Sequence, residues 1–216
     1  MELNIIANLL IISLVPMVPL LLGSVGEIVA EKAGVVNIGI EGIFLLSALT
    51  SAVIDFFTGN LILAILTGIV TGTGLGILHG IISVYLRGDQ IVAGVGVNML
   101  AYGLCVISLV TIWETFGSSP PVKTVPKLKI FDLRISPLVI VSMAIALVTW
   151  YFLFKTNTGL RLRACGEDPR AAETMGVNVM RTRFLATVYG AMLAGLEGAY
   201  LSIDWVGTIY KRNSSR

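Results

Sequence analysis

The chain has 216 residues, of which 56% are hydrophobic and only 13% are charged, and its mean hydropathy is +0.90. A water-soluble domain cannot bury so many apolar residues. The composition therefore excludes a water-soluble protein and predicts an integral membrane protein. The formal net charge is only +2, and the basic residues lie in loops between apolar runs, which argues against a nucleic-acid partner.

Charge-poor apolar stretches of about 20 residues recur along the chain, long enough to cross the roughly 30 Å hydrocarbon core of a bilayer. Backbone amides in lipid must be satisfied within the segment, and the alternating ten-residue strands of a membrane barrel are not seen. The sequence therefore predicts an all-α, multi-pass bundle in the plasma membrane, with residues 1–216 forming a single domain. Six spans are expected at residues 5–25, 33–54, 61–86, 90–113, 135–154 and 184–203.

The first span is interpreted as a retained helix, because no Lys or Arg precedes Lys32 and the apolar stretch is too long for a signal peptide. The second and sixth spans each hold a carboxylate, Glu41 and Glu197. A charge at the centre of a membrane helix costs roughly 2.5 to 3.5 kcal/mol on insertion scales, so both side chains should face protein or water.

Two spans share a short pattern: V-N-I-x-x-x-G at Val36–Gly42 and V-N-M-x-x-x-G at Val97–Gly103. Paired glycine-interrupted segments can mark a binding site near the middle of the membrane. We therefore expect four polar residues to line a translocation path and to offer hydrogen bonds to a small polar solute: Asn37, Glu41, Asn98 and Tyr102. The alternative is that these side chains hold the helices together by hydrogen bonds.

Two long polar loops, residues 114–134 and 155–183, are separated by one span and should face opposite sides of the membrane. The second carries six Lys or Arg residues and the first carries four. Basic loops prefer the cytoplasm, so we expect residues 155–183 inside and the amino terminus outside.

The cytoplasmic loop contains G-E-D-P-R-A-A-E-T-M-G at Gly166–Gly176, which has helix signals at both ends. Asp168 suits the N-cap, Pro169 suits the first helical position and Gly176 suits the left-handed residue after the last turn. We expect a short surface helix with a low apolar knob for a partner's groove, made of Ala171, Ala172 and Met175. An amphipathic helix lying at the lipid headgroups is the alternative.

Two segments resemble the membrane permease subunits of ATP-binding-cassette importers, in the branch that takes up simple sugars, nucleosides and branched-chain amino acids. They are G-E-I-V-A-E-K-A-G-V-V-N-I-G-I-E-G at Gly26–Gly42 and R-A-C-G-E-D-P-R-A-A-E-T-M-G at Arg163–Gly176. Within that branch they are most similar to the nucleoside and simple-sugar permeases. The wider coupling-loop pattern is Glu-Ala-Ala, three residues, Gly, nine residues, then Ile-x-Leu-Pro. The chain matches it at Ala171, Ala172 and Gly176, whereas Arg170 replaces the Glu, and Ala186, Val188 and Tyr189 stand where the Ile, Leu and Pro would.

The resemblance implies a transporter subunit rather than an enzyme. It implies a second permease subunit in a homo- or heterodimer, a separate ATPase subunit and an extracellular solute-binding lipoprotein. The chain lacks a G-x-x-x-x-G-K-[ST] loop, so ATP would be used by the ATPase subunit, and no cofactor or metal is expected in this chain. The residues expected to couple to the ATPase are Gly166, Glu167, Asp168, Pro169, Ala171, Ala172, Met175 and Gly176.

Two other functions remain open. A proton-coupled carrier would use Glu41 or Glu197 as a relay and would transport without ATP. A shortened, inactive permease is also conceivable, because the polar tail Lys211–Arg216 stands where permeases of this branch continue into further spans. The sequence favours the importer permease.

Overall fold

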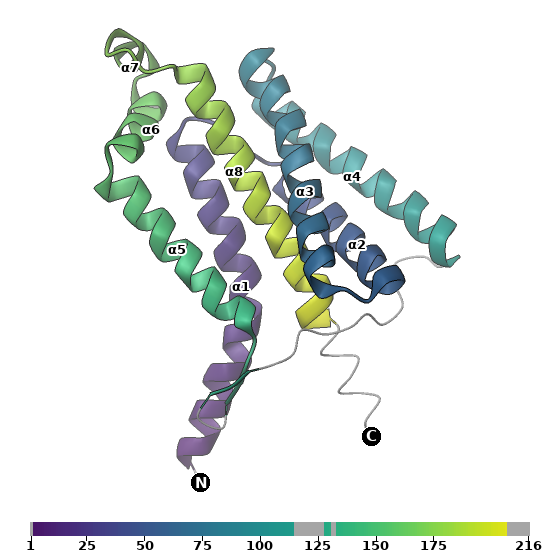
Figure 1. Ribbon diagram of the computed structural model, residues 1–216. Helices are drawn as coiled ribbons and strands as arrows, with labels where there is room; N and C mark the ends of the chain where they lie inside the picture. Colours follow the sequence, from purple (N-terminus) through teal and green to yellow (C-terminus); the bar gives the residue numbers. More distant parts are fainter. Residues whose placement is uncertain (1, 115–127, 131–132, 207–216) are drawn as a thin grey trace.

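The computed structural model describes residues 2–114, 128–130 and 133–206, so the polar tail Lys211–Arg216 lies outside the described residues. Within them, helices dominate and one short antiparallel hairpin connects two of the helices (Figure 1). The helices are α1 (Glu2–Lys32), α2 (Ile40–Thr58), α3 (Leu61–Gly80), α4 (Gln90–Trp113), α5 (Pro137–Lys155), α6 (Asn157–Glu167), α7 (Pro169–Thr174) and α8 (Val179–Tyr200). Two π-helical segments, η1 (Ile81–Tyr85) and η2 (Leu201–Val206), extend α3 and α8, and the hairpin pairs β1 (Leu128–Ile130) with β2 (Leu133–Ile135).

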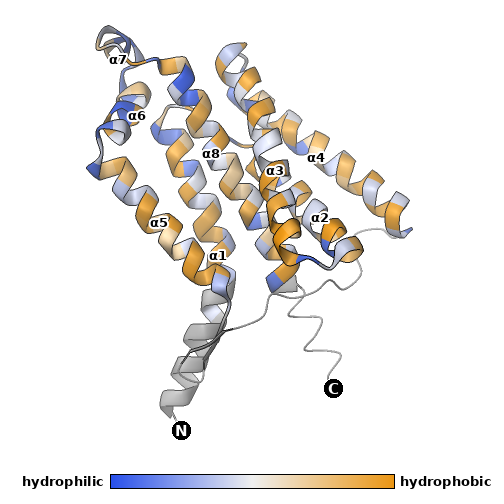
Figure 2. Cartoon of the chain, viewed as in Figure 1, coloured by the Kyte–Doolittle hydropathy of each residue, from blue (hydrophilic) through white to orange (hydrophobic). Residues whose placement is uncertain are grey.

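The predicted all-α membrane bundle is confirmed. Among the described residues, five helices are long and apolar enough to cross a membrane: Ile40–Thr58, Leu61–Tyr85, Gln90–Trp113, Pro137–Lys155 and Val179–Asp204. The remaining expected span, the first one at residues 5–25, lies within α1. Hydrophobic residues cover most of the length of these helices in Figure 2, as a lipid environment requires.

The spanning helices alternate in direction. In Figure 1, α1, α3 and α5 run toward the end of the bundle that carries α7, while α2, α4 and α8 run away from it. The β1–β2 hairpin and the α6–α7 segment therefore lie at opposite ends, as expected for the two polar loops. We call the end with α6 and α7 the coupling end.

Helix α8 lies at the centre of the bundle and meets three helices through glycines. A Cβ added at Gly190 would lie 2.7 Å from the Gly26 oxygen of α1, and one added at Gly195 would lie 2.6 Å from the Gly68 oxygen of α3. At Gly198 an added Cβ would overlap the backbone of α2. Because lipid is as apolar as the protein interior, close backbone approach of this kind drives helix association in membranes.

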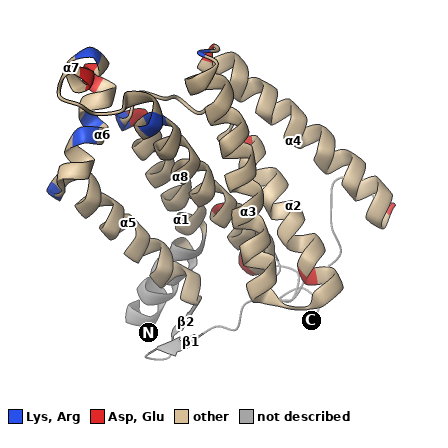
Figure 3. Cartoon of the chain, turned by 45° about the horizontal axis from the view of Figure 1, so that its top comes forward, with Lys and Arg blue, Asp and Glu red and all other residues tan. Residues whose placement is uncertain are grey.

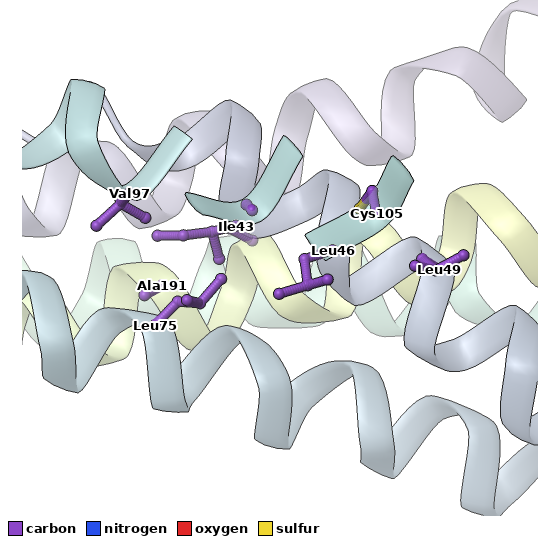
Figure 4. Close-up of a cluster of buried hydrophobic side chains, with 9 residues drawn as sticks. Ile43, Leu46, Leu49, Leu75, Val97, Cys105 and Ala191 are labelled. Atoms are coloured by element: carbon purple, nitrogen blue, oxygen red, sulfur yellow. The ribbon is translucent and has the colours of Figure 1, made fainter. Parts of the chain in front are cut away.

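The largest buried cluster joins α2, α3, α4 and α8 (Figure 4). Its members are Ile43, Leu46, Leu49, Leu75, Val97, Ala101, Cys105, Ala191 and Ala194. The stabilisation here comes from van der Waals contact between well-packed side chains, since burial from lipid yields little transfer free energy.

The second expected span begins later than the apolar pattern suggests. Residues 33–54 were expected to be helical, but α2 starts at Ile40, and residues 33–39 form a non-helical connection that we call the α1–α2 linker. Gly34 adopts φ +87°, in the left-handed region, and this ends α1. Hydropathy alone does not distinguish such an apolar linker from a helix.

The loop expected at residues 155–183 is largely helical. The side chains of Thr156, Asp168 and Asn178 accept hydrogen bonds from the first turns of α6, α7 and α8, and these caps divide the segment into three helices. As a result α8 starts at Val179, five residues before the predicted start of the sixth span at residue 184.

Candidate functional site

The α1–α2 linker is held by side chains from two helices. The Asn37 N–H donates to Glu27 Oε1 of α1 at 2.9 Å, and the Val36 N–H donates to Gln90 Oε1 of α4 at 2.8 Å. Gln90 Nε2 in turn donates to the Gly34 oxygen at 3.4 Å. Non-helical backbone is tolerated in a membrane protein where protein groups satisfy it, and these bonds meet that condition.

Asn98 caps the start of α2 from the neighbouring helix. Its Oδ1 accepts from the Gly42 N–H at 2.7 Å, and its Nδ2 donates to the Ile38 oxygen at 3.0 Å. Asn98 stands eight residues beyond Gln90, the first residue of α4, a distance of about 12 Å along the helix axis. The linker therefore reaches into the bundle, and α2 begins about two turns deeper than α4.

Asn37 also serves the linker. Its side chain is 3% exposed, and its Oδ1 accepts from the Gly39 N–H at 3.1 Å. The structure thus brings Asn37 and Asn98 together at one stretch of backbone, where both hold helix ends. That either one also contacts a solute stays a prediction.

The other two expected path residues lie on open surfaces. Glu41, in the first turn of α2, is exposed, and Tyr102, one turn beyond Asn98 on α4, is 64% exposed. Only 17% of the residues in the apolar stretch of α4 are buried within the chain, against 61% in the apolar stretch of α8. A carboxylate facing lipid is costly, so this open α2–α4 face is suited to a water-filled path or to a second subunit rather than to acyl chains.

The two V-N-x-x-x-x-G segments have different conformations, so they are not a structural repeat. Val97–Gly103 is continuous helix within α4, whereas Val36–Gly42 comprises most of the linker and the first turn of α2. Instead of marking two equivalent sites, the segments bind each other through Asn98 and Gly42.

Two further polar residues of the spans, Glu197 and His79, face protein. Glu197 on α8 points at α1, where a Cβ added to Gly23 would lie 2.7 Å from its Oε2. His79 on α3 is packed inside the bundle, with 0% of its surface exposed. Among the described residues, no group of three or more His, Cys, Asp or Glu side chains could hold a metal ion.

Helix α7 forms as the sequence predicts. Asp168 Oδ1 accepts from the N–H groups of Arg170 and Ala171, each at 3.0 Å, and Pro169 is the first residue of the helix. Gly176 follows with φ +80°. The helix lies at the coupling end of the bundle, where most of the Lys and Arg residues coloured in Figure 3 are found.

The expected knob on α7 needs a correction. Ala172 is only 3% exposed because it packs against Cys165 of α6 and Val179 of α8. Ala171 is exposed and Met175 is 84% exposed, so these two residues, four apart on one face, form the apolar surface that a partner could reach. Ala172 instead anchors α7 to the bundle.

A cleft of about 540 Å³ separates α7 from the turn between η1 and α4. Three arginines from three elements line it: Arg87, Arg170 and Arg183. Two further expected coupling residues lie beside it at the end of α6, where Glu167 is exposed and Gly166 contacts the linker backbone.

Three residues at this site escaped the sequence interpretation: Glu27, Gln90 and Arg183. Glu27 lies inside the Gly26–Gly42 segment, and its position as a carboxylate at the end of an apolar span could have marked it as a site residue. Nothing in the spacing links Gln90 or Arg183 to the linker, because both contacts join residues more than 50 positions apart.

The fold defines a polytopic helical membrane protein with a short, capped helix, α7, at one end. The sequence matches the family described as "Branched-chain amino acid transport system / permease component" over residues 9–210, and the chain belongs to that family. Family and helices together make it a multi-pass protein of the plasma membrane.

Similar curated proteins include two named for nucleosides. The guanosine ABC transporter permease protein NupQ of Bacillus subtilis is 35% identical over 86% of this chain and 64% of its own length. The nucleoside ABC transporter permease protein NupC of Lactococcus lactis is 36% identical over 90% of this chain and 66% of its own length. The putative glucose ABC transporter permease protein TsgC13 of Haloferax volcanii is 34% identical over 85% of this chain and 59% of its own length.

The chain thus spans about 59 to 66% of the length of these curated relatives. No solved structure matches it significantly.

Proposed function

We propose that this chain acts as a permease subunit of an ATP-binding-cassette importer for a nucleoside or a simple sugar. The observation that carries the proposal is α7, a capped helix that holds Ala171 and Met175 outward at the basic end of the bundle. An exposed Met beside a small residue suits insertion into an apolar groove of another protein. The names of the relatives, two for nucleosides and one for glucose, support the solute class.

The partner at α7 is an ATPase subunit, which binds and hydrolyses the ATP; this chain binds no cofactor of its own. The basic residues at the coupling end support a cytoplasmic position, where ATP is available. An extracellular solute-binding lipoprotein delivers the solute at the opposite end.

A second permease subunit, identical or related, covers the open α2–α4 face. Glu41 and Tyr102 on that face then border the translocation path between the subunits, where a carboxylate and a phenol can bind hydroxyl groups or ring nitrogens. Asn37 and Asn98 shape the same region by fixing the linker and the start of α2.

Copurification tests the proposal. The chain is expressed with an ATP-binding-cassette ATPase subunit from the same organism and purified in detergent through a tag on the permease. We expect the ATPase subunit to copurify with the wild type and with Met175→Leu, which keeps an apolar side chain, and to be lost with Met175→Glu. If binding is the same in all three proteins, α7 is not the docking element.

A further inference from the structure

We propose that Arg183 is a positioning residue that transmits movement of the α6–α7 segment to the α1–α2 linker. The inference rests on the proposed function, because it assigns a route from the ATPase docking helix to the translocation path. It concerns a contact between elements far apart in the sequence, and it does not depend on which solute is carried.

The Arg183 guanidinium joins two helix ends. Its Nε donates to the Ala33 oxygen at 3.0 Å, and its Nη2 donates to the Cys165 oxygen at 2.9 Å. Ala33 directly follows α1, and Cys165 lies in the last turn of α6. A cation is favourable at a helix C-terminus, and the planar fork of arginine can serve two such ends at once.

Both carbonyls lack the donor that a continuing helix would supply. The oxygen of Cys165 would accept from the fourth residue beyond it, but that residue is Pro169, which has no N–H. The oxygen of Ala33 would accept from Asn37, whose N–H instead donates to Glu27. Arg183 replaces both missing donors, so its two bonds are not duplicated by the backbone.

Two glycines let the joined backbones touch. A Cβ added to Gly34 would lie 2.8 Å from Arg183 Nη2 and 3.1 Å from the Cα of Gly166. A Cβ added to Gly166 would overlap the Lys32 oxygen. The end of α6, the guanidinium and the start of the linker therefore form one close-packed block.

The block continues into α4 on its far side. Gln90 binds the linker at Val36 and Gly34, and Asn98 binds it at Ile38. By contrast, the cleft lined by Arg87 and Arg170 leaves α7 apart from the turn that precedes α4. A push on α7 thus reaches the open α2–α4 face through α6, Arg183 and the linker, in addition to the packing of Ala172 on α8.

Transport per ATP hydrolysed tests this route. The permease is assembled with the ATPase subunit, the solute-binding lipoprotein and a second permease subunit, and reconstituted in vesicles with guanosine or glucose as the probe. We compare the wild type with Arg183→Met, Arg183→Lys and the matched control Arg181→Met, whose arginine is exposed two residues earlier on α8.

We expect Arg183→Met to keep ATPase binding and hydrolysis within about twofold of the wild type while uptake per ATP falls at least tenfold. Arg183→Lys should retain an intermediate ratio, because its charge stays but its fork is lost, and Arg181→Met should match the wild type. An unchanged ratio in Arg183→Met, or a loss of uptake and hydrolysis in the same proportion, overturns the role of Arg183. A wild type that binds no ATPase overturns the proposed function instead.

A distance measurement needs no Arg183 variant. Spin labels are placed at Glu31→Cys and Glu167→Cys, two exposed positions at the ends of α1 and α6, while both native cysteines are buried. If Arg183 makes one block of these ends, the distance between the two labels stays constant when ATP is added. A change in the distance between residues 31 and 167 on ATP binding contradicts the proposal.

Discussion

The Asn98 side chain of α4 accepts a hydrogen bond from the backbone N–H of Gly42 at 2.7 Å, so the first turn of α2 is capped by another helix. A Cβ at Gly42 would lie 2.7 Å from the Asn98 Cα, so the two backbones can approach this closely only with a glycine. This bond joins the two segments that share the V-N-x-x-x-x-G pattern, and it forms the junction between the spans α2 and α4.

Replacing Asn98 should weaken this junction. Asn98→Ala leaves the Gly42 N–H and the Ile38 oxygen without their side-chain partners, and we expect a loss of about 1 to 3 kcal/mol in the free energy of unfolding. Asn98→Asp keeps the acceptor for Gly42 and should lose less. Unfolding in mixed detergent micelles, followed by tryptophan fluorescence, measures both variants. Equal stability of Asn98→Ala and the wild type would rule out the capping role.

Substitutions on α7 should separate folding from docking. Ala172→Glu places a carboxylate among Cys165 and Val179, and we expect misfolded protein because an unpaired buried charge is costly. Met175→Glu alters an exposed side chain and should leave the chain monodisperse in detergent. Size-exclusion chromatography distinguishes the outcomes, and the opposite pattern would mean that α7 is turned the other way.

Glycines on α3 offer a matched pair for the packing of α8. A Cβ at Gly72 would lie 2.6 Å from the Ala191 oxygen, while a Cβ at Gly74 meets nothing within 4 Å. We expect Gly72→Ala to lower the free energy of unfolding by about 1 to 3 kcal/mol through overpacking. Gly74→Ala should be neutral or raise stability by up to about 1 kcal/mol, because alanine is the better helix former. Thermal unfolding in detergent compares the two, and similar shifts would contradict the close α3–α8 contact.

The N-cap residue Asp168 should contribute to the local stability of α7. Asp168→Ala removes the acceptor for the N–H groups of Arg170 and Ala171, which costs about 0.5 to 2 kcal/mol of local helix stability. Hydrogen exchange of residues 169–175 should then quicken, whereas Asp168→Asn, which keeps an acceptor oxygen, should stay near the wild type. Unchanged exchange in the alanine variant would mean that tertiary contacts alone hold α7.

Much of this architecture follows from local chemistry, which is why the sequence predicts it. Uncharged apolar runs locate the spans. Asp168 and Pro169 predict where α7 begins, and Gly176 predicts where it ends to within two residues. The α1–α2 linker could not be predicted, because its residues are as apolar as a helix and its bonds come from Gln90 and Asn98 on a distant span.

The orientation of α7 and the role of Arg183 depend on tertiary structure in the same way. Periodicity places Ala171, Ala172 and Met175 near one another, but only contact with Cys165 and Val179 decides that Ala172 faces inward. Arg183 binds the oxygen of Ala33, which lies 150 residues away in the chain, and no local sequence pattern predicts that contact.

ATP-dependent uptake tests the account most directly. Vesicles that contain the chain, its ATPase subunit and a second permease subunit are loaded with ATP on the side of the ATPase, and labelled guanosine or glucose is added with the lipoprotein outside. We predict uptake that requires ATP, disappears with Met175→Glu and persists when the proton gradient is collapsed. Uptake driven by a proton gradient without ATP, and abolished by Glu41→Gln, would contradict the importer and favour a proton-coupled carrier.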